Sequence, residues 1–300
     1  SAASATVYNI TVNPLPTPTI GGPNDVCEAS TGNNYTTEAG MSNYAWTVSA
    51  GGTITNGGGV NDDFVEVTWN GTGAQSVSVN YSDGNSCSAA APTVYNVNVN
   101  ALPTPTIAGP NDVCEASTGN NYTTEAGMSN YTWTVSAGGA ITNGGGVNDD
   151  FVEVTWNGTG AQSVSVNYID GNSCTAASAT VLNVNVNALP VPTIGGPNDV
   201  CVGSTGNTYT TEAGMTNYTW TVSAGGTITS GGGINDNSVT VTWNNAAPQT
   251  VTVNYTNGNG CSAASATVYN ITVNPLPTPS IAGPNDVCEA STGNTYTTEA

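Results

Sequence analysis

The sequence contains no lysine, arginine or histidine, and 20 of its 300 residues are acidic, which gives a formal net charge of −20. A chain of this sign repels nucleic-acid phosphates and anionic lipids, and electrostatic attraction supplies much of the affinity for both. We therefore expect neither a nucleic-acid partner nor a membrane partner. Only 7% of the residues are charged, so Asn, Thr, Ser and Gly must cover most of the surface.

The missing residues also remove the usual catalytic groups. Without histidine or lysine, a serine or threonine nucleophile lacks its common general base. Asp62 with Asp63, and Asp149 with Asp150, are adjacent carboxylates. Neighbours on a strand point to opposite faces, whereas a glycosidase needs two carboxyl groups facing one gap. The sequence thus predicts a protein that is not an enzyme. The absence of lysine also excludes isopeptide crosslinks and leaves disulfides as the available covalent brace.

The residues that are present repeat with a period of 87. In one copy Tyr131, Trp133 and Val135 lie two apart, so they share one face of a strand, and we expect that face to be core. The same strand recurs along the chain, which places the predicted core tryptophans Trp46, Trp133 and Trp220 at intervals of 87 residues. A period of this length predicts tandem domains.

The repeat sets the expected domain boundaries. Three full copies span residues 15–101, 102–188 and 189–275, while 1–14 match the C-terminal strand of a preceding repeat and 276–300 the start of a further one. We therefore expect the sequence to be a segment of a longer array. It has no initial Met, no signal peptide and no apolar run long enough to cross a bilayer, so targeting signals are expected outside it.

Within the middle copy, alternating apolar and polar residues predict about seven short strands and no helix. The first is expected over the proline-rich residues 102–107, with a turn over 109–112, and the last over 181–187. Seven strands in fewer than ninety residues predict an all-β fold of tandem seven-stranded antiparallel sandwiches. Short junctions containing proline restrict the angle between repeats, so we expect the array to be an extended rod.

The cysteines form two series with the same period: Cys27, Cys114, Cys201 and Cys288, then Cys87, Cys174 and Cys261. We expect disulfides within each copy, joining Cys27 to Cys87, Cys114 to Cys174 and Cys201 to Cys261, with the partner of Cys288 beyond residue 300. The second cysteine should lie in the last hairpin, near the N-terminal end of its own domain. The first cysteine of the next copy would then be about a domain length away, beyond the roughly 6 Å that a disulfide spans.

The alternative pairing crosses a boundary, joining Cys87 to Cys114, Cys174 to Cys201 and Cys261 to Cys288. Metal binding by the thiols is disfavoured, because the sequence has no CxxC motif and no histidine. Disulfides persist in oxidising compartments, so we expect an extracellular or cell-surface location.

Calcium is the one cofactor that the sequence raises. Asp62, Asp63, Asp149 and Asp150 lie in glycine-rich loops, and hard cations bind carboxylate oxygens. The third copy carries Asn237 in place of the second aspartate, and the loops do not match an EF-hand. We therefore favour solvated turn residues and expect no cofactor.

Each copy carries, in order, Pro-x-Pro-Thr-Ile, Asn-Asp-Val-Cys, Asn-Tyr-x-Trp-Thr-Val, Val-Thr-Trp-Asn, a later Cys, and an alternating Val strand that runs into Leu-Pro. This order of motifs resembles that of PKD-like, immunoglobulin-like tandem repeats in giant secreted surface adhesins of gliding Bacteroidota-type bacteria. This resemblance implies a structural segment of an extracellular filament or adhesin stalk. The implied partners are the neighbouring repeats, and further like chains or a surface ligand at an unseen tip.

A multivalent array that binds carbohydrate or another ligand is the alternative function. Such an array would need exposed aromatic rings to stack on sugars. Tyr44, Trp46, Trp69, Tyr81 and Tyr95 instead fall on the apolar phase of their strands, so we expect them in the core.

Overall fold

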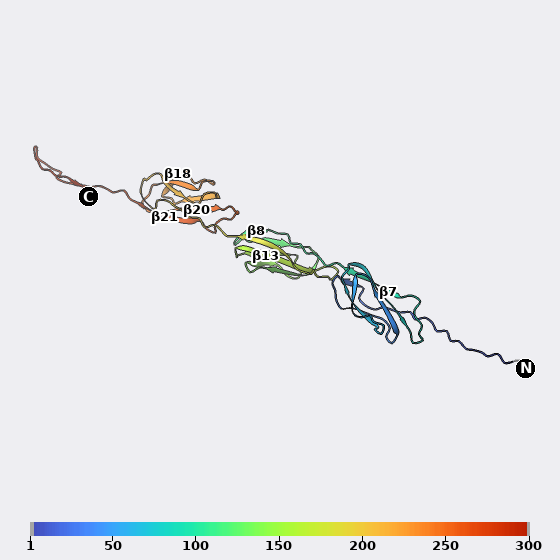
Figure 1. The fold of residues 1–300 in the computed structure, drawn as a ribbon. Helices are drawn as coiled ribbons and strands as arrows, with labels where there is room; N and C mark the ends of the chain where they lie inside the picture. The colour runs from blue at the N-terminus through green and yellow to red at the C-terminus, as the bar shows by residue number, and fades with distance from the viewer. Residues whose placement is uncertain (1–2, 299–300) are drawn as a thin grey trace. The chain divides into compact units, whose positions relative to one another are not determined.

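The computed structural model describes residues 3–298, and every regular element in that range is a strand. The described residues include no helix of the length and apolarity needed to cross a membrane. Each of the three repeats forms one four-stranded and one three-stranded sheet (Figure 1). The prediction of an all-β chain of tandem sandwiches is therefore confirmed.

The first repeat shows the arrangement that the other two copy. Its strands are β1 (Asp25–Cys27), β2 (Asn33–Thr36), β3 (Ser42–Val48), β4 (Gly52–Gly57), β5 (Phe64–Trp69), β6 (Gly73–Ser82) and β7 (Thr93–Asn100). They pair in the orders β1-β7-β6-β3 and β2-β5-β4.

The second and third repeats have the same orders, β10-β13-β14-β8 with β11-β12-β9, and β15-β21-β20-β17 with β16-β19-β18. The second comprises β8 (Asp112–Cys114), β9 (Asn120–Thr123), β10 (Ser129–Val135), β11 (Gly139–Gly144), β12 (Phe151–Trp156), β13 (Gly160–Ile169) and β14 (Thr180–Asn187). The third comprises β15 (Asp199–Cys201), β16 (Asn207–Thr210), β17 (Thr216–Val222), β18 (Gly226–Gly231), β19 (Ser238–Trp243), β20 (Pro248–Thr256) and β21 (Thr267–Asn274). Near the C-terminus, β22 (Ile281–Ala282) pairs with β23 (Thr297–Thr298).

The first strand of each repeat differs from the prediction in place and direction. The segment 102–107 forms no strand, because Pro103 and Pro105 lack the N–H that a ladder needs. The first strand is instead β8, which begins at the last residue of the turn predicted over 109–112. It pairs with β14 in parallel, with Asp112 opposite Asn185 and Cys114 opposite Asn187. The expectation of antiparallel pairing throughout was therefore wrong for this strand. Its last residue lies at the end where the chain leaves the repeat.

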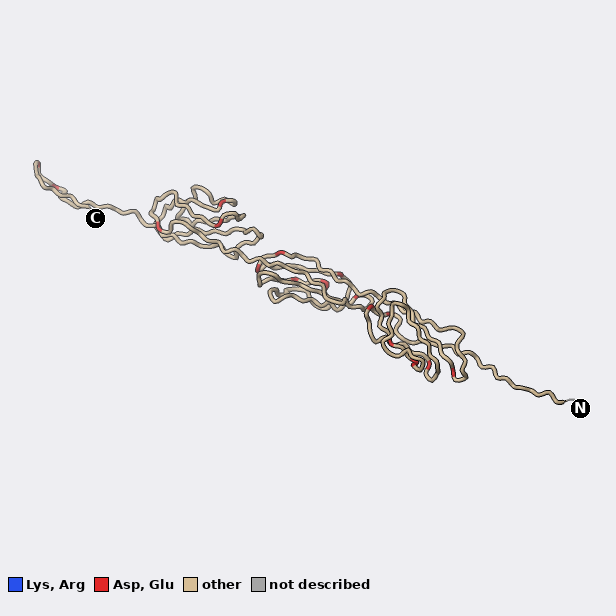
Figure 2. Tube along the Cα trace, viewed as in Figure 1, with Lys and Arg blue, Asp and Glu red and all other residues tan. Residues whose placement is uncertain are grey.

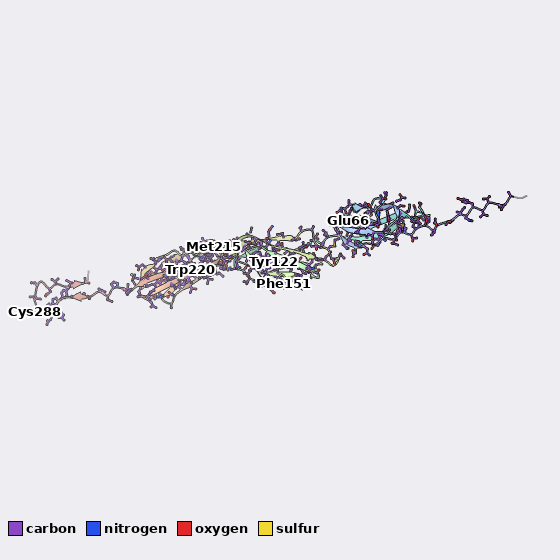
Figure 3. All side chains as sticks on the ribbon, turned by 90° about the horizontal axis from the view of Figure 1, so that it is seen from below. Glu66, Tyr122, Phe151, Met215, Trp220 and Cys288 are labelled. Carbon is purple, nitrogen blue, oxygen red and sulfur yellow. A yellow bond between two sulfur atoms is a disulfide. The ribbon has the colours of Figure 1, made fainter. Side chains whose placement is uncertain are left out.

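The core of each repeat lies between its two sheets and is built on aromatic residues. Trp69 and Tyr35 are both 0% exposed, their ring centroids are 6.3 Å apart in an edge arrangement, and the Trp69 indole donates a 3.0 Å hydrogen bond to the Tyr35 hydroxyl. The tryptophans of the repeated Tyr-x-Trp strand, Trp46, Trp133 and Trp220, are 9%, 8% and 8% exposed. Figure 3 labels Trp220 among the strands of the third repeat. The aromatic strand residues thus fill the interior.

The charges are acidic and spread out. Asp and Glu occur in all three repeats, and no cationic side chain lies beside them (Figure 2). Carboxylates in this chain can therefore be satisfied only by hydrogen-bond donors such as hydroxyls, amides and backbone N–H groups, and not by ion pairs within the chain.

Candidate functional site: the interrepeat disulfides

Two disulfides join consecutive repeats. Cys27 is bonded to Cys174 and Cys114 to Cys261, each with 5.6 Å between Cα atoms and a sequence separation of 147. The first cysteine of one repeat is thus bonded to the second cysteine of the following repeat. We call each such bond, with the two loops that carry it, an interrepeat clasp. By its internal contacts the chain divides into two compact units, which do not coincide with the three repeats. Cys27 and Cys174 both lie in the first unit, and Cys114 and Cys261 both lie in the second.

The pairings expected from the sequence were wrong. Cys27 is not bonded to Cys87, nor Cys114 to Cys174, nor Cys201 to Cys261, and the alternative pairs across one boundary are also absent among the described residues. Cys87, Cys201 and Cys288 are free thiols. The physical reason lies in where each cysteine sits along the last strand of its repeat.

The first cysteine lies at the C-terminal end of its repeat. In the second repeat Cys114 is the register partner of Asn187, the last residue of β14. The pairing continues one residue further, since the Glu115 N–H donates to the Asn187 carbonyl at 2.8 Å. Ala116 then adopts a positive φ of 59° and donates to the Trp156 carbonyl at 2.7 Å. This tight turn holds the cysteine where the chain leaves the sandwich.

The second cysteine lies at the N-terminal end of its repeat, in the hairpin before the last strand. In the third repeat the side-chain oxygen of Asn257 accepts hydrogen bonds from the N–H groups of Cys261 and Asn259, both at 3.0 Å. Gly260 takes a positive φ of 78° between them. The same loop in the second repeat uses Asp170 and Ser173, the latter with φ of 64°. An Asx-type turn therefore presents this cysteine.

These placements explain why the two cysteines of one repeat are not bonded to each other. Within the second repeat, Cys114 and Cys174 lie at opposite ends of β14, an eight-residue strand that spans roughly 26 Å at about 3.3 Å per residue. A disulfide needs Cα atoms about 6 Å apart. The sequence interpretation placed the second cysteine correctly, but it missed the parallel strand that carries the first cysteine to the other end.

The clasp between the second and third repeats borders a cleft of about 280 Å³. Glu115 comes from the loop after Cys114, Ala264 and Ser265 from the segment after Cys261, and Pro190 and Val191 from the connection between repeats. The disulfide, the connection and the two loops therefore meet at one place.

A second set of contacts fixes the connection to the sandwich that follows it. In the first repeat the Glu38 carboxylate accepts hydrogen bonds from the Thr19 hydroxyl (2.6 Å), the Thr37 hydroxyl (2.8 Å) and the Tyr81 hydroxyl (3.1 Å). The Thr19 N–H also donates to Glu38, and the Pro18 carbonyl accepts from the Thr93 hydroxyl at 2.7 Å. We call this set the glutamate latch.

The latch perturbs both of its ionisable groups. Partial burial would raise the pKa of Glu38, but the hydrogen bonds donated by Thr19 and Thr37 outweigh that effect and lower this pKa to about 2. Burial, the hydrogen bond to Glu38 and the charge of Glu38 together raise the pKa of Tyr81 to about 12. Glu125 with Tyr168, and Glu212 with Tyr255, show the same pair of shifts. The sequence interpretation missed this latch, although Thr-Glu-Ala-Gly recurs in every full copy.

The candidate calcium ligands accept hydrogen bonds in and around the loop between β4 and β5 and the equivalent loop of the second repeat. The Asp62 carboxylate accepts from the Gly59 N–H at 2.8 Å, and the Asp62 carbonyl accepts from the Trp46 indole at 2.9 Å. Asp149 makes the same two contacts, with Gly146 and Trp133. Asp63 and Asp150 accept backbone hydrogen bonds from Thr37 and Thr124 through their carbonyls. Among residues 3–298, no three His, Cys, Asp or Glu side chains gather as a metal site would require.

Comparison with solved structures gives distant likenesses. The adhesin FdeC of Escherichia coli is 16% identical with a TM-score of 0.32, over 88% of this chain and 99% of that chain. The D00-D0 domain of intimin is 15% identical with a TM-score of 0.32, over 57% and 99%. Invasin, a bacterial integrin-binding protein, is 16% identical with a TM-score of 0.29, over 89% and 61%. No curated protein matches the chain.

These TM-scores are below 0.5, so the assignment rests on the sequence family. The PKD-like domain matches residues 13–97, 100–184 and 187–271, one match for each sandwich and together most of the chain. The chain therefore belongs to the PKD-like domain family, as three tandem copies.

Proposed function

We propose that this chain is a structural segment of an extracellular fibre or cell-surface adhesin stalk, in which PKD-like repeats supply length and fixed spacing. The observation that carries the proposal is the pair of clasps Cys27–Cys174 and Cys114–Cys261, which bond each repeat covalently to the next. A protein that only needed stable single domains would gain most from a bridge within each domain. A bridge between domains instead resists their separation.

The clasps also shorten the covalent route along the chain. Tension applied at the two ends would pass from Cys27 to Cys174, back through the second repeat to Cys114, and on to Cys261. This route bypasses residues 28–113 and 175–260, roughly 170 residues or about 600 Å of extended chain. The oxidised array would therefore lengthen far less under load than a simple tandem chain.

The surroundings of the clasps fit a role outside the cell. Disulfides persist in oxidising compartments, and the sequence offers trypsin-like proteases no lysine or arginine at which to cut. The glutamate latch and a buried proline, Pro105 in the second repeat, hold each connection against the sandwich that follows.

We propose no catalytic role and no carbohydrate binding by the repeats. Without histidine or lysine the repeats lack the usual general bases. Sugar stacking needs exposed rings, whereas Tyr44, Trp46, Trp69 and Tyr81 are all under 10% exposed. The chemistry that the repeats do offer is thiol oxidation, which serves assembly.

Single-molecule pulling on the 300-residue chain tests the mechanical role. We expect the oxidised chain to release about 600 Å less contour length than the same chain after reduction. The Cys288→Ser variant is the matched control, because Cys288 is an exposed free thiol in the terminal segment (Figure 3), and it should behave as the parent. Equal contour lengths before and after reduction would contradict the proposal. So would saturable binding of the repeats on a glycan array.

A further inference from the structure

We infer that Cys201 and Cys87 are the two open halves of the same clasp, and that each is closed by a PKD-like repeat of this design. Cys201 would take the second cysteine of a repeat that follows, and Cys87 the first cysteine of a repeat that precedes. The partner is identified by its chemistry and its fold: a thiol in the same hairpin or the same strand end. This inference does not depend on the stalk role.

The middle repeat supplies the pattern. Its first cysteine, Cys114, is bonded forward to Cys261, and its second, Cys174, is bonded backward to Cys27. Both bonds have the same separation of 147 residues. A repeat with neighbours on both sides therefore uses both of its cysteines in clasps, whereas the outer repeats each keep one free.

The backbone around Cys201 matches that of its bonded counterparts. Cys201 is the register partner of Asn274 in parallel strands, as Cys114 is of Asn187. The next N–H, of Val202, donates to the Asn274 carbonyl at 2.9 Å, and Gly203 follows with a positive φ of 78°. Cys201 is exposed, whereas Cys27 and Cys114 are partly covered. The strand end is formed before any partner binds.

The hairpin around Cys87 is likewise in its bonded form. The Asp83 carboxylate accepts from the N–H groups of Cys87 and Asn85, both at 2.9 Å, and Ser86 has a positive φ of 61°. Cys174 and Cys261, which are bonded, are 0% and 1% exposed, while Cys87 is only partly buried. A preceding repeat would supply the missing cover as well as the missing sulfur.

Closing the clasp is an oxidation, and we name a small-molecule disulfide as the oxidant. One protein thiolate attacks the oxidant, forms a mixed disulfide and releases one thiolate. The second protein thiolate then attacks the protein sulfur of the mixed disulfide and releases the other. Two protein thiols are oxidised to one disulfide, and the oxidant is reduced to two thiols.

A tandem chain tests the inference directly. Residues 276–300 match 15–39, so joining residue 300 to Gly40 of a second copy continues the 87-residue period without interruption. In this chain the second copy's cysteine at position 87 falls 147 positions after Cys201. After oxidation with glutathione disulfide, peptide mapping should find that cysteine bonded to Cys201, and the second copy's cysteine at position 174 bonded to Cys288.

The Cys201→Ser variant of the tandem chain is the matched control. It should free the second copy's cysteine at position 87 and leave the bond to Cys288 in place. If Cys201 stays free in the oxidised, unsubstituted tandem chain, or is bonded to any other cysteine there, the inference is overturned. This holds even if the array proves to be a stalk.

The 300-residue chain alone distinguishes the two sources of the partner. A concentration-dependent, reducible multimer that yields a Cys87–Cys201 peptide supports the inference and shows that a second copy of this chain can close the clasp. A multimer linked through Cys288 at random overturns closure between copies, which leaves the contiguous repeat, tested by the tandem chain, as the partner.

Discussion

Cys114 and Asn187 lie opposite each other in parallel strands, although 73 positions separate them in the sequence. Asn187 ends the last strand of the second repeat, so Cys114 stands where the polypeptide passes to the third. The clasp partner, Cys261, lies in the hairpin before the last strand of that third repeat. The parallel pair therefore decides that the disulfide joins two repeats and does not close one.

Removing this clasp should destabilise the third repeat. With the second repeat folded, Cys114 is fixed beside Asn187, so the disulfide closes a loop of roughly 75 residues when the third repeat unfolds. Loop-closure entropy then gives a stabilisation of about 4 kcal/mol. In the Cys114→Ser, Cys261→Ser double variant we expect the free energy of unfolding of the third repeat to fall by up to that amount. Hydrogen exchange of the backbone amides in β19 and β20 measures this change.

The single variant Cys201→Ser is the control for this loss, because it removes a thiol of the same series that is free and exposed. It should leave protection in β19 and β20 unchanged. An equal protection of the double variant and the oxidised parent would show that the clasp does not stabilise the folded repeat.

Substituting the buried tyrosine that accepts a hydrogen bond from a fully buried tryptophan should also lower the stability of its repeat. Tyr209 and Trp243 are both 0% exposed, and the Trp243 indole donates to the Tyr209 hydroxyl at 3.0 Å. Tyr209→Phe would leave a buried N–H without this acceptor, which costs about 1–3 kcal/mol. Urea unfolding of the oxidised chain measures the change. Tyr269→Phe is the matched control, since the Tyr269 hydroxyl belongs to an exposed contact with the Gly196 carbonyl, and it should cost less.

Much of this fold follows from strand periodicity. Tyr131 and Trp133 alternate with polar residues, and that pattern alone predicted a strand with an inward face, which the structure places over Ser129–Val135. Asp112–Cys114 is different, because three residues are too few to show a period. Its strand pairing comes from a partner 73 positions away, and no local pattern encodes the direction of such a pair.

The glutamate latch escaped prediction for a similar reason. The sequence shows that Thr37-Glu38-Ala39-Gly40 recurs, but the donors to Glu38 come from Thr19 and from Tyr81, 43 positions away. A single carboxylate carries no spacing rule. Only the folded arrangement of the connection, the loop and β6 brings these groups together.

At the position just before the second cysteine of a repeat, glycine should preserve the stability of the hairpin, whereas a β-branched residue should lower it. Ser173 and Gly260 occupy equivalent places with φ of 64° and 78°. This left-handed region costs a non-glycine residue about 1 kcal/mol or more, so Ser173→Gly should leave stability unchanged or slightly raised. Gly260→Val should lower the midpoint of thermal unfolding and slow oxidation of Cys261. Gly258→Val, in the same loop but without a positive φ, is the control, and equal effects of the two valines would contradict this account.

The glutamate latch predicts how stability depends on pH. The pKa of Glu212 is lowered to about 2 in the folded chain, so its contribution is present above the ordinary value near 4.5 and is lost as pH falls from there to about 2. The pKa of Tyr255 is raised to about 12, so its contribution is present below about 10 and is lost as pH rises toward 12. No histidine intervenes, and we expect a broad plateau between these limbs.

The Glu212→Gln variant separates the latch from the rest of the acidic chain. It should lower stability at neutral pH and flatten the fall between pH 4.5 and 2, because an amide does not titrate, and it should weaken the fall above pH 10 by removing the charge beside Tyr255. Glu153→Gln removes one charge from β12 instead, and it should keep both limbs. Urea unfolding at a series of pH values gives the curves. If the Glu212→Gln variant and the parent chain lose stability in parallel between pH 4.5 and 2, protonation of Glu212 is not the cause of the loss of stability in acid.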